Sequence, residues 1–292
     1  MAIFIFQFTR IPGTIIGSAI GDAMGAPFEG SDFVAQIPER MASGGPFSTR
    51  KGEYTDDTHQ MIALARTLAT CRGFEAADFL HRLVEIYLLH PEYFGPTSSA
   101  VLKAVVRGVD PAKARESVPK ESRSNGAVMR GAPLGIFYRP PDVVLMSSIA
   151  AAVTHTHPVA IACSTTVNHM ISILCRGGTR EEAFFHALES CTSPEVRRRL
   201  ARLSSTPLVP SLDALDTTHA AVTCWMEEPT YPKMIQRAIA LGGDTDTVAA
   251  ICGALGGATF GLAGIPGVWI ADLEGAEELL LLEEKVWNAG QK

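Results

Sequence analysis

The sequence predicts an all-α protein folded as a single compact multi-helix domain. Apolar residues recur at helical spacing along most of the 292 residues, and few segments alternate as half-buried strands do. Glycine and proline lie between the apolar runs, and Ser, Thr or Asp often stands where a run begins, as at helix ends and starts. No repeat, composition break or low-complexity linker divides the chain. We therefore expect one domain over 1–292.

The helical pattern is clearest in two adjacent segments. Within 57–71 the residues Met61, Leu64 and Leu68 share one apolar face, and 76–90 repeats the pattern. Glycine and proline separate the other runs, as in Gly-Ile-Pro-Gly at 264–267. In chain order, the predicted helices are 12–26, 57–71, 76–90, 97–108, 126–138, 142–154, 158–176, 180–191, 193–203, 213–225, 231–241, 245–263 and 272–289.

The first nine residues are apolar but do not resemble a membrane span or a signal peptide. They are too short to cross a bilayer, and no positively charged segment precedes them. We predict a strand-like or poorly fixed N-terminal extension over 1–10, and no membrane association.

Charge and cysteine usage favour a cytoplasmic enzyme that acts on a small ligand. Lys and Arg total 25 against 31 Asp and Glu, and the net charge of −6 gives no general electrostatic reason to bind nucleic acid. The six cysteines form no CxxC pair and lie mostly among apolar residues, which indicates buried thiols rather than disulfides or a zinc site. A monomer is the default expectation.

A glycine-rich stretch interrupts the first predicted helix. Gly21 and Gly25 each cost about 1 kcal/mol relative to alanine in a helix interior, and close approach of another helix is one explanation. We expect Asp22, between them, to cap or brace a neighbouring loop. Glu29 follows Pro27, where the helix should have ended, so its side chain can project from a loop. By itself, Glu29 would be an ordinary surface residue.

Two short acidic clusters lie far apart in the chain, Thr-Asp-Asp-Thr at 55–58 and Asp-Thr-Asp-Thr at 244–247. Each precedes a predicted helix, so helix capping is the structural alternative. Capping needs only one such residue and does not explain two neighbouring carboxylates in each cluster. Carboxylates this close repel unless a hard divalent cation neutralises them. We therefore predict a metal site closed by the fold, with Gly242 and Gly243 allowing a sharp turn before the second cluster.

Two further polar segments stand at helix boundaries. The loop at 122–127 precedes small residues, so free backbone N–H groups there could meet an anion or a sugar, although Asn-Gly is also a common turn. His155 and His157 are two residues apart, a spacing that does not place both on one helix face as zinc ligands. One of them could cap a helix while the other faces solvent.

Five motifs, in order along the chain, resemble the ADP-ribosylglycohydrolase family. They are Gly-Asp-Ala-Met-Gly at 21–25 with Glu29 downstream, Tyr-Thr-Asp-Asp-Thr at 54–58, Ser-Asn-Gly-Ala-Val-Met-Arg at 124–130, Thr-His-Thr-His at 154–157 and Gly-Gly-Asp-Thr-Asp-Thr-Val-Ala at 242–249. Each motif is weak alone, whereas five in the same order are specific.

The resemblance implies an all-α fold with two Mg²⁺ or Mn²⁺ ions at the base of a cleft. By analogy, the metal ligands are Thr55, Asp56, Asp57, Asp244, Asp246 and Thr247. The catalytic residues implied are Glu29, as the acid–base group, with Asp57 and Asp246. The residues implied to contact ADP-ribose are Gly95, Ser124, Asn125, Gly126 and His155.

The activity that the resemblance implies is hydrolysis of the glycosidic bond between ADP-ribose and a modified acceptor. The acceptor would be a protein side chain or a small molecule, with a nucleic-acid end expected only as a modified acceptor. Such chemistry builds oxocarbenium-like charge on the ribose and needs a water that is aimed and deprotonated there.

Three other functions are alternatives to this one. All-α prenyl and terpene synthases also use Asp-rich motifs with Mg²⁺, but their DDxxD motif needs an acid where this chain has Gln60 or Met61. A catalytically inactive ADP-ribose-binding relative is disfavoured because Glu29 and all four Asp of the clusters are present. Hydrolysis of a related ribosyl or nucleotide metabolite is compatible with every local feature.

Overall fold

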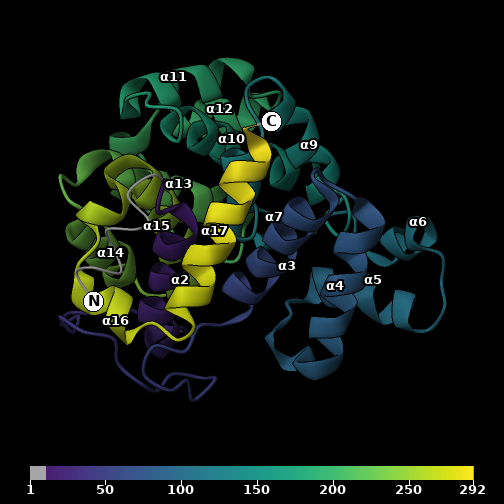
Figure 1. Ribbon diagram of the computed structural model, residues 1–292, viewed down its shortest axis with the longest axis horizontal. Helices are drawn as coiled ribbons and strands as arrows, with labels where there is room; N and C mark the ends of the chain where they lie inside the picture. Colours follow the sequence, from purple (N-terminus) through teal and green to yellow (C-terminus); the bar gives the residue numbers. More distant parts are fainter. Residues whose placement is uncertain (1–10, 292) are drawn as a thin grey trace.

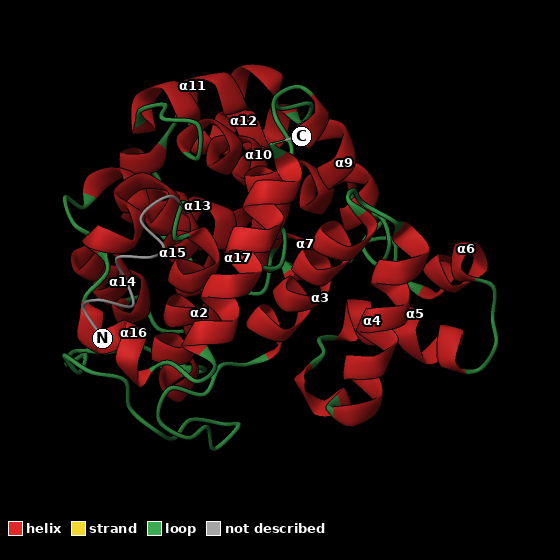
Figure 2. Cartoon of the chain, in the orientation of Figure 1, coloured by secondary structure: helices red, strands yellow, loops and turns green. Residues whose placement is uncertain are grey.

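The computed structural model describes residues 11–291, and its regular structure there is helical (Figures 1 and 2). Within this range no strand forms, and the only bridges are isolated ones, Gly44 with Thr49 and Ser124 with Asp213. The all-α prediction is therefore confirmed. The predicted extension over 1–10 lies outside the described residues.

The helices have the following bounds. The longer ones are α2 (Thr14–Gly25), α3 (Asp56–Cys71), α4 (Ala76–Leu89), α5 (Pro96–Val106), α9 (Asp142–Ala151), α10 (Pro158–Leu174), α11 (Arg180–Ser190), α13 (Ala214–Glu227), α14 (Tyr231–Ala240), α15 (Thr245–Gly264) and α17 (Ala276–Gly290). The shorter ones are α6 (Pro111–Ala114), α7 (Gly126–Met129), α8 (Ala132–Phe137), α12 (Pro194–Leu200) and α16 (Gly267–Asp272). Four 3₁₀ turns are added, η2 (Ala26–Phe28), η3 (Pro91–Tyr93), η4 (Arg115–Ser117) and η5 (Leu203–Ser205).

Helices α2 and α15 form the centre of the molecule and lie unusually close together. Every residue of α2 is buried, and glycines occupy the shared seam. A Cβ added to Gly21 would lie 2.0 Å from the carbonyl oxygen of Ala249, and one added to Gly17 would lie 2.3 Å from that of Gly253. Only glycine fits such a contact. Of the explanations that the sequence left open for these glycines, the structure therefore supports close helix approach.

Helix α17 runs beside both α2 and α3 (Figure 1) and supplies a cap to α2. Gly13, at the N-cap, has no side chain to cap the helix. The fully buried Glu283 of α17 instead accepts hydrogen bonds from the backbone N–H groups of Thr14 (2.6 Å), Ile15 (3.1 Å) and Ile16 (3.4 Å). Burial outweighs these bonds and raises the pKa of Glu283 to about 7.

Helix α15 is long and apolar enough, by length and composition, to cross a membrane. However, 67% of its most apolar window is buried inside the domain, where it packs on α2, α13 and α14. A mostly buried core helix of a globular domain passes the same test.

Several helix predictions differ from the structure. The segment predicted as one helix over 193–203 is α12 followed by the separate turn η5. The segment 126–138 is two short helices, because Pro133 has no N–H to donate and the backbone at Gly131 packs against Asn168, whose Nδ2 would lie 2.5 Å from an added Cβ. After the break predicted at 264–267, the structure has the short helix α16, which was not among the predicted helices. The last helix begins at Ala276 rather than at 272, after Gly275 in a left-handed conformation with φ of 64°.

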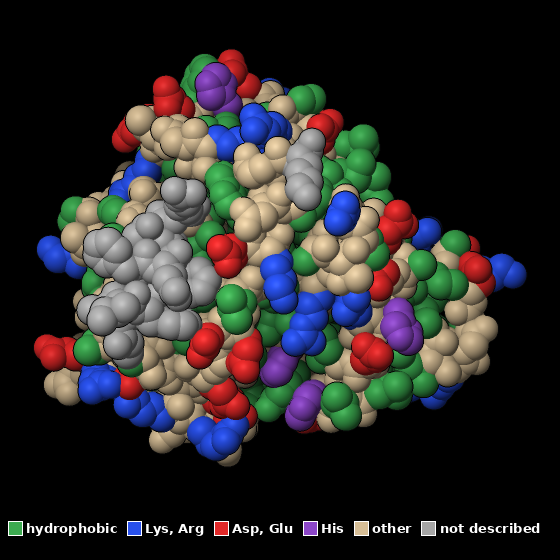
Figure 3. Space-filling model, viewed as in Figure 1, with side chains coloured by type: hydrophobic (Ala, Val, Ile, Leu, Met, Phe, Trp, Pro, Cys, Tyr) green, Lys and Arg blue, Asp and Glu red, His purple; other side chains and the backbone are tan. Residues whose placement is uncertain are grey.

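The surface carries both signs of charge. On the face shown in Figure 3, Lys and Arg side chains are interspersed with Asp and Glu, and neither sign fills the face. All six cysteines are free, and five are buried or partly buried as predicted, while Cys71 is exposed.

Candidate active site

The two acidic clusters, far apart in the sequence, meet in one cleft of about 220 Å³. Helix α3 begins with Asp56, and α15 begins just after Asp244. The hydroxyl of Thr247 donates a hydrogen bond to Asp57 Oδ2 at 3.3 Å, which joins the clusters directly. The carboxylates that line the cleft are Glu29, Asp56, Asp57, Glu92, Asp244 and Asp246.

Asp22 positions the first cluster. Its carboxylate accepts hydrogen bonds from the backbone N–H and hydroxyl of Thr55 (3.0 and 2.8 Å) and from those of Thr58 (3.0 and 2.7 Å). The expectation that Asp22 caps or braces a neighbouring loop is confirmed. From helix α2, its carboxylate accepts the backbone N–H groups that would otherwise lack partners at the start of α3. Asp56 and Asp57 are therefore not needed as caps. Thr55 is fully buried beneath them and does not line the cleft.

The second cluster is positioned by a double-glycine turn. Gly242 and Gly243 have φ values of 75° and 62°, the left-handed region that glycine adopts most readily. The backbone N–H of Gly30 donates to the carbonyl of Gly243 at 2.8 Å, and that of Gly243 donates to the carbonyl of Ser31 at 2.7 Å. These two bonds hold the loop of Glu29 against the start of α15.

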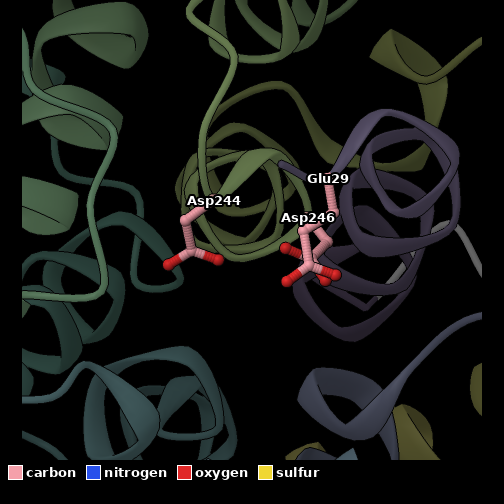
Figure 4. Close-up of side chains that lie close together, drawn as sticks. All are labelled: Glu29, Asp244 and Asp246. Atoms are coloured by element: carbon pink, nitrogen blue, oxygen red, sulfur yellow. The ribbon is translucent and has the colours of Figure 1, made fainter. Parts of the chain in front are cut away.

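Three carboxylates from these segments converge. Ligand oxygens of Glu29, Asp244 and Asp246 all lie within 4.8 Å of one another. In Figure 4 the carboxylates of Glu29 and Asp246 lie together and that of Asp244 faces them. Asp244, although it stands at the N-cap of α15, makes no capping hydrogen bond. Capping therefore does not account for these acids.

The pKa values of the acids in the cleft are raised, which indicates that positive charge is needed to stabilise their ionised forms. Burial, followed by neighbouring carboxylates, raises the pKa of Asp57 and Asp246 well above the ordinary value for aspartate. Burial, Asp244 and Asp22 together raise the pKa of Glu29 to about 7. No Lys or Arg lines this cleft in the part of the chain that the structure describes. Asp57 Oδ1 and Glu29 Oε2 are buried without a hydrogen-bond partner. Such a set of oxygen donors fits a hard divalent cation.

The residues expected to contact ADP-ribose also line the cleft, and the side chains of Ser124, Asn125 and His155 already make hydrogen bonds there. Gly95, the N-cap of α5, has open space around the position of a Cβ. Asn125 donates from Nδ2 to Asp244 Oδ2 and to the hydroxyl of Thr217. Gly126 packs on the imidazole of His155, whose Cε1 would lie 3.0 Å from an added Cβ.

The two histidines have different roles. His157 caps α10 by accepting the backbone N–H of Val159 at 3.2 Å, as one of the pair was expected to do. The expectation that the other faces solvent is wrong, because His155 is only 1% exposed. Its Nε2 lies 3.0 Å from Ser124 Oγ, and Ser124 in turn donates to Thr97 Oγ1 at 2.7 Å.

Sequence reasoning missed several residues of the cleft. Gln60, considered only as a departure from DDxxD, donates from Nε2 to Asp56 Oδ2 at 2.6 Å. Phe47 and Tyr93 line the wall with ring centroids 5.2 Å apart. Tyr93 lies two residues from Gly95, and that proximity was the one available signal. Phe47 belongs to a long loop whose path the sequence does not reveal.

Comparison with known proteins agrees with this geometry. A solved structure described as an ADP-ribosylglycohydrolase-related protein complex superposes with a TM-score of 0.85 at 29% identity, covering 97% of this chain and 99% of that one. An uncharacterized protein of Archaeoglobus fulgidus is 30% identical over 94% of both chains. The ADP-ribosyl-[dinitrogen reductase] glycohydrolase of Rhodospirillum rubrum is 27% identical over 91% of this chain and 90% of its own. The model of the ADP-ribosylglycohydrolase family matches residues 6–292, and the chain belongs to this family.

Proposed function

We propose that this protein is a hydrolase that depends on divalent cations and releases ADP-ribose from a modified acceptor. The observation that carries the proposal is the convergence of Glu29, Asp244 and Asp246 beside Asp56 and Asp57 in one cleft where, among the described residues, no Lys or Arg offsets their charge. The family and the Rhodospirillum relative support ADP-ribosyl hydrolysis as the reaction. The proposed substrate is an ADP-ribosylated protein or a small ADP-ribose conjugate.

The residues proposed to hold two divalent cations, Mg²⁺ or Mn²⁺, are those of the two clusters, Thr55, Asp56, Asp57, Asp244, Asp246 and Thr247. Thr55 donates its hydroxyl hydrogen to Asp22, and its oxygen keeps a lone pair for a cation. When bound, such ions supply positive charge that orients ribose hydroxyls and acidifies water. They would also relieve the repulsion that raises the pKa of each buried acid.

Glu29 is proposed as the general acid–base group. It follows η2 on a loop, lies in the cleft and has a buried Oε2 without a partner. This oxygen can take a proton from water directed at the anomeric carbon and return it to the leaving group. Asp57, from the first acidic cluster, and Asp246, from the second, are proposed to act together with Glu29.

The remaining cleft residues are proposed to hold ADP-ribose. Ser124, Gly126 and His155 lie together at one wall, and Gly95 opens the wall near α5. Asn125 is proposed to act mainly through Asp244, because its amide donates to that carboxylate.

The test is a panel of ADP-ribosylated arginine, ADP-ribosylated serine and small ADP-ribose conjugates, assayed with Mg²⁺, with Mn²⁺ and with a chelator. We expect release of ADP-ribose from at least one substrate, and loss of release with the chelator or after Asp56→Ala or Asp246→Ala. Glu29→Gln should slow turnover more than it weakens ADP-ribose binding. Binding of ADP-ribose without release from any substrate would instead identify an inactive relative. Full activity after chelation would refute the metal dependence.

A further inference from the structure

Arg130 is a fully buried cation without a direct carboxylate partner. It is 1% exposed, and within residues 11–291 its side chain forms no ion pair. Its hydrogen bonds go from Nη1 to Gln60 Oε1 at 2.9 Å and from Nη2 to Thr154 Oγ1 at 2.6 Å. The guanidinium also lies 5.3 Å from the ring centroid of Phe79. Burial of an arginine without an ion pair costs free energy. The role of its two hydrogen bonds can explain why this position holds an arginine.

The first bond fixes the orientation of Gln60. Because the guanidinium can only donate, the amide oxygen of Gln60 must face Arg130. The amide nitrogen then faces Asp56 and donates to its Oδ2 at 2.6 Å. A flipped amide would place its NH₂ against the guanidinium and its oxygen against a carboxylate. Arg130 thereby ensures that Gln60 presents a donor to the Asp56 carboxylate, whose other oxygen has no hydrogen bond among the described residues.

The second bond fixes the protonation pattern of His155. Thr154 Oγ1 accepts from Arg130 and lies 2.8 Å from His155 Nδ1. The hydroxyl hydrogen of this buried threonine has no other acceptor within the described chain, so it points to Nδ1. The proton of the neutral imidazole therefore sits on Nε2, which donates to Ser124 Oγ at 3.0 Å. The hydroxyl of Ser124 donates a hydrogen bond to Thr97 Oγ1.

We propose that Arg130 is a positioning residue that sets both halves of the active site through two separate branches. The metal branch runs through Gln60 to Asp56, and the ADP-ribose branch runs through Thr154 to His155 and Ser124. The inference rests on the proposed function for the identity of the two ligands. Arg130 does not line the cleft, and in this proposal it acts only through its neighbours.

The two branches can be cut one at a time. Gln60→Met removes the amide between Arg130 and Asp56 and keeps the side-chain length. Thr154→Val removes only the hydroxyl between Arg130 and His155. A matched control is Thr166→Val, because Thr166 is also buried and its hydroxyl donates within α10 to the carbonyl of Ala162 at 2.7 Å. Arg130→Lys keeps the charge but cannot make both bonds in the planar geometry of arginine.

The readouts are the Mn²⁺ affinity and the ADP-ribose affinity, both by calorimetry, and the tautomer of His155 by ¹⁵N NMR of histidine-labelled protein. We expect Gln60→Met to weaken Mn²⁺ binding about tenfold or more, as loss of a residue that orients a metal ligand does, with the His155 signal unchanged. We expect Thr154→Val to weaken ADP-ribose binding several-fold and to alter the His155 signal while Mn²⁺ affinity stays within about twofold. Arg130→Lys should weaken both.

Several outcomes would overturn the inference. A wild-type His155 protonated on Nδ1 would contradict the direction of the ADP-ribose branch. Equal effects of Gln60→Met and Thr154→Val on both ligands, or effects no larger than those of Thr166→Val, would mean that Arg130 has only a packing role. If the wild-type protein binds neither Mn²⁺ nor ADP-ribose, the proposed function fails, and the NMR result alone then decides the ADP-ribose branch.

Discussion

The close contact between α2 and α15 at Gly21 gives the sharpest prediction. Replacement of Gly21 by alanine adds a Cβ that would lie 2.0 Å from the carbonyl oxygen of Ala249 and 2.4 Å from its carbonyl carbon. Both neighbours are backbone atoms inside a long helix, so no side-chain rotation can relieve the contact. The helices must separate.

The size of the effect follows from this distance. An ordinary contact between such atoms is about 3.4 Å or longer, so the distance from the added Cβ to the Ala249 carbonyl oxygen must grow from 2.0 Å by roughly 1.4 Å. Overpacking of this kind costs about 1–3 kcal/mol or more, and alanine recovers about 1 kcal/mol of helix propensity relative to glycine. We expect Gly21→Ala to lower the free energy of unfolding by about 2 kcal/mol, and Tm by about 4 °C.

The same displacement should reach the active site. Asp22 follows Gly21, and Asp246 lies one helical turn before Ala249. Moving these helices apart separates the carboxylate that caps α3 from the acids of α15. We therefore expect Mn²⁺ to bind Gly21→Ala more weakly than wild type, measured as a smaller rise in Tm on adding Mn²⁺ to the chelator-treated protein.

Gly267→Ala provides a matched control. Gly267 begins α16, and a Cβ there would meet no atom within 4 Å. This variant should keep or slightly raise Tm and keep the full Mn²⁺ response. If Gly21→Ala melts and binds Mn²⁺ like Gly267→Ala, the glycine seam does not set the distance between the helices.

Three further predictions concern the acids and the histidine wall. Glu283 has a pKa of about 7 in the folded protein against an ordinary 4.5, so the folded state holds its proton more tightly. The stability contributed by this proton is complete below about pH 4.5 and is lost as pH rises through 7. The total loss is about 3 kcal/mol. Urea titrations should show this loss in wild type and a smaller one in Glu283→Gln. Asp246→Asn should raise the Tm of the cation-free protein, because it removes a buried like charge, and should abolish the rise in Tm with Mn²⁺; a lower Tm without cations would contradict the repulsion. Gly126→Ala should displace the ring of His155, which would lie 3.0 Å from the new Cβ, and weaken ADP-ribose binding in calorimetry while Mn²⁺ affinity is unchanged.

The sequence allowed most of the helices to be predicted, because apolar spacing reflects which face is buried. Long periodic runs such as 57–71 and 245–263 agree with α3 and α15 to within about one residue. Short helices were harder to predict. The interruption at Gly131 depends on Asn168 of another helix, and no local pattern encodes a tertiary neighbour.

The two acidic clusters could be predicted to form one site from the sequence. Carboxylates adjacent in sequence repel in any fold unless a cation neutralises them, and that need indicates a shared site. The connections behind them could not be assigned. Gln60 and Arg130 belong to α3 and to the α7–α8 junction, and only the fold brings them within hydrogen-bond distance. Likewise, nothing local to Glu283 indicates that it caps a helix 269 residues away.

That long-range cap affects the order in which the active site can form. Asp22 organises α3, α2 carries Asp22, and α2 in turn needs α15 along its glycine face and Glu283 at its first turn. We therefore expect the acids near the N-terminal end to stay unorganised during synthesis until the segment through α17 has left the ribosome. The proposed metal site would become complete only when the fold does, so we expect a nascent or truncated chain lacking α15 and α17 to have no preformed centre for a cation.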